Sequence, residues 1–82
     1  MDIIPCIEKY LNGSVETLMI EVDHKNKTVE IFPHIDGWSS TDTVDVIRVD
    51  IPRYIKQSIL LYLFFYNIHE AIKDIPEEYK VI

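Results

Sequence analysis

The sequence TLMIEVDHKNKTVEIFPHI, from Thr17 to Ile35, contains two segments in which apolar and polar residues alternate. In Thr17–Asp23 the apolar residues recur at every second position, which is the repeat of a strand with one buried face. Thr28–Ile35 alternates in the same way, and Pro33 marks its end or a sheet edge because proline cannot donate to the ladder. The polar connection over 24–27 has the length of a hairpin turn. We expect an antiparallel hairpin whose inward residues are Leu18, Ile20, Val22, Val29 and Ile31.

The outward-facing positions of these two strands carry both acidic and large apolar residues. Met19 and Phe32 stand among carboxylates, and Trp38 follows in a turn-rich segment beside Asp36. Apolar side chains ringed by charge are typical of binding patches, although one or two apolar residues on an exposed face are also ordinary. The pattern predicts a partner-binding surface made of Met19, Glu21, Asp23, Glu30, Phe32, Asp36 and Trp38.

Helices are expected on either side of the strands. A short helix over Ile3–Leu11 takes Asp2 as its cap, and a long helix runs from a cap at Asp50 to about Ile72. A third strand is expected over Val44–Ile51. The sequence therefore predicts one α+β domain over residues 1–82, ordered α-β-β-β-α, with a three-stranded antiparallel meander and both helices packed on one face.

The run Ile59–Tyr66, ILLYLFFY, is apolar on every side of a helix. A helix without a polar face needs cover on more than one side. We expect the sheet to cover Ile55, Ile59, Tyr62 and Tyr66 and the short first helix to cover part of the remainder. A second copy of the chain is expected to cover the rest, making a homodimer. A fully internal helix in a monomer is the alternative. The expected self-association residues are Leu60, Leu61, Phe64, Phe65 and Ile68.

Charge and composition restrict the possible partners. The formal net charge is −6, and residues 14–50 hold eight acids against three bases. This balance argues against direct binding to nucleic acid, where Lys and Arg neutralise phosphates, and favours a partner with a basic surface. The apolar run is too short for a membrane span, and one cysteine without a signal peptide indicates a cytoplasmic protein.

Catalytic and metal-binding motifs are not apparent in the sequence. The histidines have no ligand spacing of the zinc-site kind, although His34 and Asp36 could place two polar groups on one loop. Ser39 and Ser40 lack a nucleophile elbow, and Cys6, in an apolar helix, is expected to be a buried structural thiol. We therefore expect no catalytic residue, no metal and no cofactor.

Three functions remain open at this point. The first is a small acidic inhibitor or regulator that docks onto a larger basic or nucleic-acid-handling protein. Such proteins recur among phage-encoded inhibitors of host defence and among bacterial immunity proteins, an analogy of size and charge without a shared motif. The second is a homo-oligomeric assembly module, and the third is a small enzyme with a loop site at His34 and Asp36.

Overall fold

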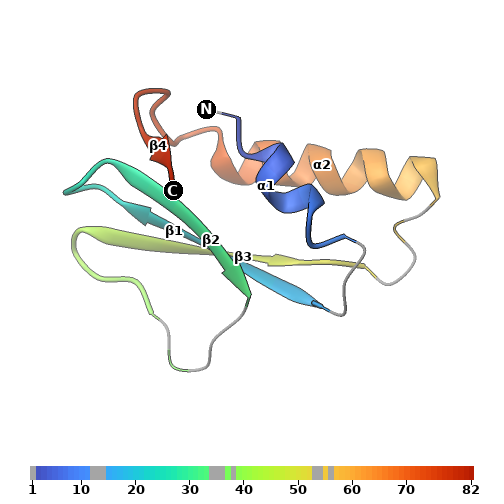
Figure 1. Ribbon diagram of the computed structural model, residues 1–82, viewed down its shortest axis with the longest axis horizontal. Coiled ribbons are helices and arrows are strands. Elements are labelled where there is room, and N and C mark those ends of the chain that lie inside the picture. The colour runs from blue at the N-terminus through green and yellow to red at the C-terminus, as the bar shows by residue number, and fades with distance from the viewer. Residues whose placement is uncertain (1, 12–14, 34–36, 38, 53–54, 56) are drawn as a thin grey trace.

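The computed structural model describes residues 2–11, 15–33, 37, 39–52, 55 and 57–82. Two helices lie on the same side of a four-stranded sheet, as Figure 1 shows. This confirms an α+β fold. The elements in chain order are α1 (Ile4–Glu8), β1 (Thr17–Asp23), β2 (Thr28–Pro33), β3 (Val44–Asp50), α2 (Ser58–Ile72) and β4 (Lys80–Val81).

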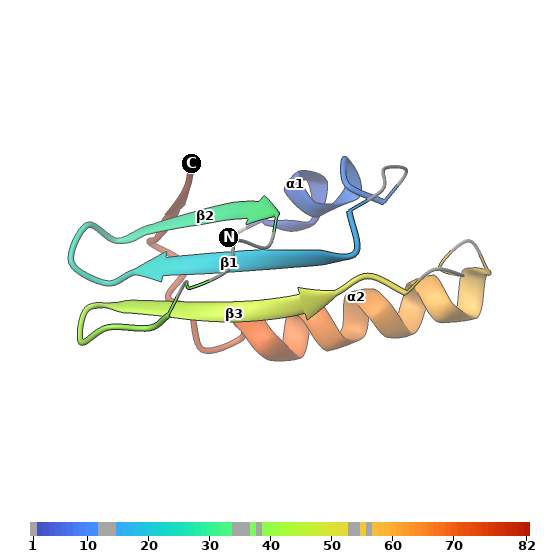
Figure 2. The same ribbon diagram turned by 90° about the horizontal axis from the view of Figure 1, so that it is seen from below.

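The sheet is not the expected meander. Its strand order is β3-β1-β2-β4, so β3 pairs with β1 and not with its neighbour in sequence, β2. The view in Figure 2 shows β1 between β2 and β3. The β1–β2 and β1–β3 pairs are antiparallel, whereas β4 adds to the other edge of β2 in parallel. The meander prediction was wrong because ten residues separate β2 from β3, enough for the chain to cross to the far side of β1.

The core lies between the sheet and the helices. The expected inward residues of β1 are almost completely buried, as is Val29 of β2, and Ile31 is half-buried. The alternation therefore assigned this face of the sheet correctly. The helices add apolar side chains from above, and the buried cluster includes Ile3, Ile7, Phe64, Ile68 and Ile72.

Both helices begin later than the sequence predicts, and α1 also ends earlier, at Glu8 instead of Leu11. The N-cap of α1 is Ile3 and not Asp2, and α2 begins at Ser58, several residues after the expected cap at Asp50. Asp50 instead belongs to β3, which continues the ladder with β1 as far as Thr17. Pro52 disfavours a helical conformation at Ile51, so Asp50 can end a strand as readily as it begins a helix and the local signal was ambiguous.

The β1–β2 turn is held by one carboxylate. Asp23 Oδ1 accepts hydrogen bonds from the backbone N–H groups of Lys25 (3.0 Å) and Asn26 (3.1 Å), and Oδ2 accepts from Asn26 Nδ2 (2.8 Å). Lys27 then takes a left-handed backbone conformation with φ of 56°, which brings the chain into β2. This is the expected hairpin, with a turn in which Asp23 satisfies the local backbone donors.

Candidate protein-binding surface

The side of the sheet away from the helices, here called the outer face, carries the strand residues of the predicted binding surface. Across the sheet, Glu30, Glu21 and Val46 form one row, and Phe32, Met19 and Arg48 form the next. Directly opposed residues in an antiparallel pair have Cβ atoms about 4.5–5.5 Å apart, so each row is a set of neighbouring side chains. Register thus brings Met19, Glu21, Glu30 and Phe32 together.

Met19 does not project from this face as an exposed anchor. Its exposed fraction is 5%, although it has the same parity as Glu21. Because β1 is central, Met19 has a large neighbour on each side, Phe32 on β2 and Arg48 on β3. The expectation of an exposed Met19 was therefore wrong, and it followed from the wrong strand order. Phe32 is half-buried and remains accessible.

The carboxylates of the outer face differ in their hydrogen-bond partners. Asp23 is used by the hairpin turn. Asp50 Oδ1 accepts hydrogen bonds from Thr17 Oγ1 and from Arg48 Nε, both at 3.1 Å. Glu21 and Glu30, by contrast, oppose each other with like charge. The acidic centre of the outer face is therefore this glutamate pair.

The electrostatic state of Glu21 reflects that arrangement. Partial burial raises the pKa of the Glu21 carboxyl above its ordinary value, and the negative charges of Glu30 and Asp23 raise it further. Asp23 behaves in the opposite way, since hydrogen bonds from Asn26 hold the pKa of its carboxyl below the ordinary value. A positive group placed beside Glu21 and Glu30 would relieve their repulsion, which is the electrostatic complement that this face offers.

The loop part of the predicted surface lies largely beyond the described residues. Asp36 and Trp38 lie outside the described residues, as does His34 of the suggested loop site. On the described side of that segment, Ser40 Oγ accepts a hydrogen bond from the backbone N–H of Val46 (3.1 Å), so the chain returns along the edge of β3.

Known proteins give no guide to this surface. Neither protein-family models, nor curated proteins, nor solved structures match the chain. Its function must be argued from the side chains themselves.

Four of the five residues predicted for self-association belong to the core or pack against it, and Leu60 lines a groove between α2 and β3. Phe64 and Ile68 are buried, and Leu60, Leu61 and Phe65 are half-buried. The expectation that this side of α2 is uncovered was wrong. Ile55 is buried as expected, but the other three residues assigned to contact with the sheet, Ile59, Tyr62 and Tyr66, are exposed, together with Leu63.

A signal for the correct rotation of α2 was present in its second half. His69, Glu70 and Lys73 leave only Ile68 and Ile72 as an apolar side there, four residues apart. Continuing that spacing backwards gives Phe64 and then Leu60 and Leu61, which are the residues turned toward the core. The apolar first half of the helix concealed this pattern.

Sequence reasoning also missed a polar cluster of three residues from three elements. His24 Nε2 lies 2.5 Å from Asp45 Oδ2, and His24 Nδ1 lies 2.8 Å from the Tyr79 hydroxyl oxygen. Asp45 can only accept, so Nε2 carries a hydrogen and donates to it. With a neutral imidazole, Nδ1 accepts from the Tyr79 hydroxyl. The three residues are too far apart in sequence for any motif to have shown them.

This cluster joins the ends of strands, and its tyrosine is enclosed by the fold. Tyr79 is buried and packs edge-on against the His24 ring, with centroids 5.6 Å apart. Its hydroxyl is already engaged with His24. The arrangement ties the segment before β4 to the hairpin turn and to β3, so its role in the fold is structural.

The described part of the chain offers neither a cluster of metal-binding side chains nor a membrane-spanning helix. No group of three His, Cys, Asp or Glu side chains there could hold a metal ion. Among the helices in that part, none has the length and apolar character needed to cross a membrane.

Proposed function

We propose that this protein is a small acidic binding module whose outer face docks onto a basic surface of a larger protein. The observation that supports this most strongly is the opposed pair Glu21 and Glu30, with the half-buried Phe32 and Val46 beside it. The two carboxylates repel each other in the free protein, so a cationic partner that pairs with both gains more than it would from two isolated acids.

The chemistry of the partner follows from that pair. A guanidinium group makes two parallel hydrogen bonds to carboxylates and is the best match for clustered acids. A protein that handles nucleic acid presents such groups in a groove, and the acidic face would compete with phosphates for them. We propose that this chemistry acts in the cytoplasm. The protein would inhibit a host-defence protein, as phage proteins do, or a toxin, as immunity proteins do.

The proposal can be tested with an arginine-rich peptide as a defined basic probe. Binding is measured by calorimetry at low and at high salt for the natural protein and for the double variant Glu21→Gln/Glu30→Gln. The double variant is expected to bind about tenfold more weakly, which corresponds to about 1.4 kcal/mol. Binding by the natural protein should weaken as salt rises.

A matched control separates the glutamate pair from net charge. The variant Glu8→Gln/Asp74→Asn also removes two charges, at exposed positions of α1 and after α2, on the helix side of the molecule. It is expected to bind as the natural protein does. Equal weakening in both double variants, or affinity that does not depend on salt, would refute docking through the outer face.

A further inference from the structure

The side of α2 opposite the core carries an uncovered apolar stripe. Ile59, Tyr62, Leu63 and Tyr66 have exposed fractions of 68%, 70%, 48% and 53%. Their spacing of three, four and seven residues places them on one side of a helix. The outer stripe of α2, defined by these four residues, is therefore a continuous surface.

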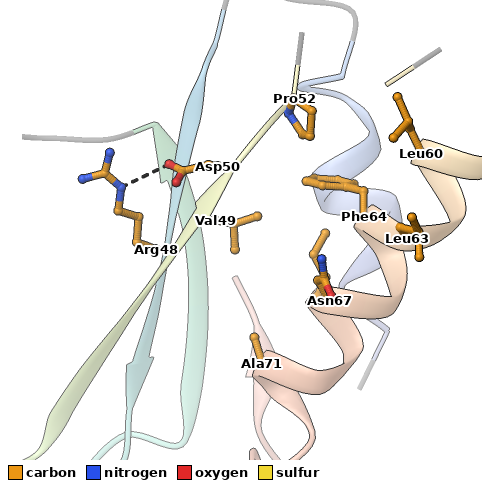
Figure 3. Close-up of a pocket in the computed structure, with 10 residues that line it drawn as sticks. Arg48, Val49, Asp50, Pro52, Leu60, Leu63, Phe64, Asn67 and Ala71 are labelled. Carbon is orange, nitrogen blue, oxygen red and sulfur yellow. Dashed lines mark hydrogen bonds and ion pairs between the residues drawn. The ribbon is translucent and has the colours of Figure 1, made fainter. Parts of the chain in front are cut away.

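The stripe adjoins a groove between α2 and the edge strand β3. The groove has a volume of about 360 Å³, and Figure 3 shows Leu60, Leu63 and Phe64 on its helix wall with Val49 opposite. Arg48 and Asp50 of β3 also line it, but their side chains point away from α2 and pair with each other on the far side of the strand, as Figure 3 shows. Leu63 belongs to both features, so the exposed apolar surface extends from the outer stripe toward β3.

Charge favours a second copy of the chain as the occupant of the stripe. The chain has a net charge of −6, yet every residue from Gln57 to Ile68 is uncharged at neutral pH. A second copy carries the same excess of negative charge and can approach closely only where the surface is neutral. The stripe offers no basic residue to an anionic membrane or to an acidic partner. A second copy of this chain meets these conditions through its own identical stripe.

The available area is sufficient for a weak dimer. Four side chains that are half to two-thirds exposed present on the order of 100 Å² each, given the 150–250 Å² of a fully buried aromatic residue. Two copies would then bury about 1,000 Å² in total with their flanking residues, near the lower limit for a specific interface. Affinity in the micromolar range is consistent with an interface of that size.

We propose that two copies associate through the outer stripes of α2, with the two helices antiparallel about a two-fold axis near Tyr62 and Leu63. Glu70 continues the line of the stripe toward the C-terminal end of the helix. There its carboxylate pairs with Lys73 Nζ at 3.2 Å, so the stripe ends at a charged pair. An antiparallel arrangement keeps the two charged ends apart and aligns the helix dipoles favourably. The dimer leaves both outer faces free because α2 packs on the opposite face of the sheet.

Sedimentation equilibrium between 1 and about 200 μM tests the association. The natural protein is expected to form dimers in this range. The variants Ile59→Glu and Tyr62→Glu are expected to remain monomeric at concentrations at least tenfold above those at which the natural protein dimerises. Ile82→Glu is the matched control, since Ile82 is also apolar and 75% exposed but lies away from α2; it should form dimers. Circular dichroism checks that the α2 variants are folded. A monomeric natural protein, or dimers formed equally by folded Ile59→Glu and Tyr62→Glu, would overturn the proposal.

Disulfide cross-linking tests the orientation, in a Cys6→Ser background. Leu63→Cys lies near the proposed axis and should form a covalent dimer. Glu70→Cys lies about 11 Å from the axis at 1.5 Å rise per residue, so its two copies should be too far apart to react. Ready cross-linking through Glu70→Cys, without cross-linking through Leu63→Cys, would refute the antiparallel arrangement.

Discussion

Glu21 on β1 and Glu30 on β2 oppose each other on the outer face of the sheet. Like charges in directly opposed positions destabilise an antiparallel pair, by an amount comparable with the roughly 0.2–1 kcal/mol of favourable cross-strand pairs. The natural protein therefore keeps an unfavourable pair in the middle of its sheet. Under the proposed function, that cost is recovered when a basic partner binds.

Replacing Glu21 by Gln is expected to stabilise the protein at pH 7 by a few tenths of a kcal/mol. The raised pKa of Glu21 means that the folded state binds its proton more tightly than the unfolded state, so this residue makes stability fall as pH rises through and above the ordinary value. Urea unfolding at pH 4 and pH 7 measures the effect. The gain of Glu21→Gln should be larger at pH 7, and an equal gain at both pH values would show that charge is not its cause.

The link between His24 and Tyr79 is expected to hold the C-terminal segment on the sheet. Tyr79→Phe removes only the hydroxyl and should cost about 0.5–1.5 kcal/mol, the net value of one hydrogen bond. Hydrogen exchange should quicken at the Lys80 amide, which bonds to the Lys27 carbonyl. Tyr66→Phe, on the exposed side of α2, is the control, and in solution dilute enough to dissociate any dimer it should change neither quantity. Unchanged exchange in Tyr79→Phe would mean that the hydroxyl contributes nothing to this attachment.

Lys27 offers a direct test of backbone strain. A left-handed conformation costs an ordinary residue roughly 1–2 kcal/mol, a cost that glycine avoids. Lys27→Gly and Lys27→Ala both remove the exposed ion pair with Glu78, so only the backbone differs between them. The Gly variant should be more stable than the Ala variant by about 1 kcal/mol in chemical unfolding. An Ala variant of equal stability would show that the turn relaxes to another conformation.

The rotation of α2 can be verified with two alanine variants in dilute solution, where any dimer dissociates. Ile68 is almost completely buried, so Ile68→Ala should cost about 2–5 kcal/mol, including the cavity it leaves. Ile59→Ala removes the same atoms from an exposed site and should change stability by about 0.5 kcal/mol or less. Similar losses in both variants would contradict the observed orientation of the helix.

The local pattern of the sequence predicted the elements better than their arrangement. The alternation of apolar and polar residues located the buried side chains of β1 and the β1–β2 hairpin. Both features are determined by residues that are close together in the sequence. The placement of β3 beside β1 depends on a long connection whose path has no periodic signal. That single difference explains why Met19 is buried and why Arg48, not included in the predicted surface, lies beside it.

The candidate surface was predictable in part for the same reason. Glu21 and Glu30 follow from strand parity and hairpin register alone, and both lie on the outer face. The exposed side of α2 did not follow, since Ile59–Tyr66 is apolar all round and its rotation is set by the packing of Ile68 and Ile72. Two-residue strands such as β4 have no sequence signature of their own, because they are defined only by the strand they join.

The parallel pairing of β4 with β2 has a consequence for the order of folding. The β1–β2 hairpin closes over a short turn, an event that takes about 1–10 μs in isolated hairpins. Lys80 and Val81 pair with Thr28 and Val29, and the chain between the two strands contains β3 and α2. Contacts this distant in sequence bear the largest loop-closure entropy. We expect β4 to attach last and to detach first, making the packing of Tyr79 the earliest point at which the native state opens.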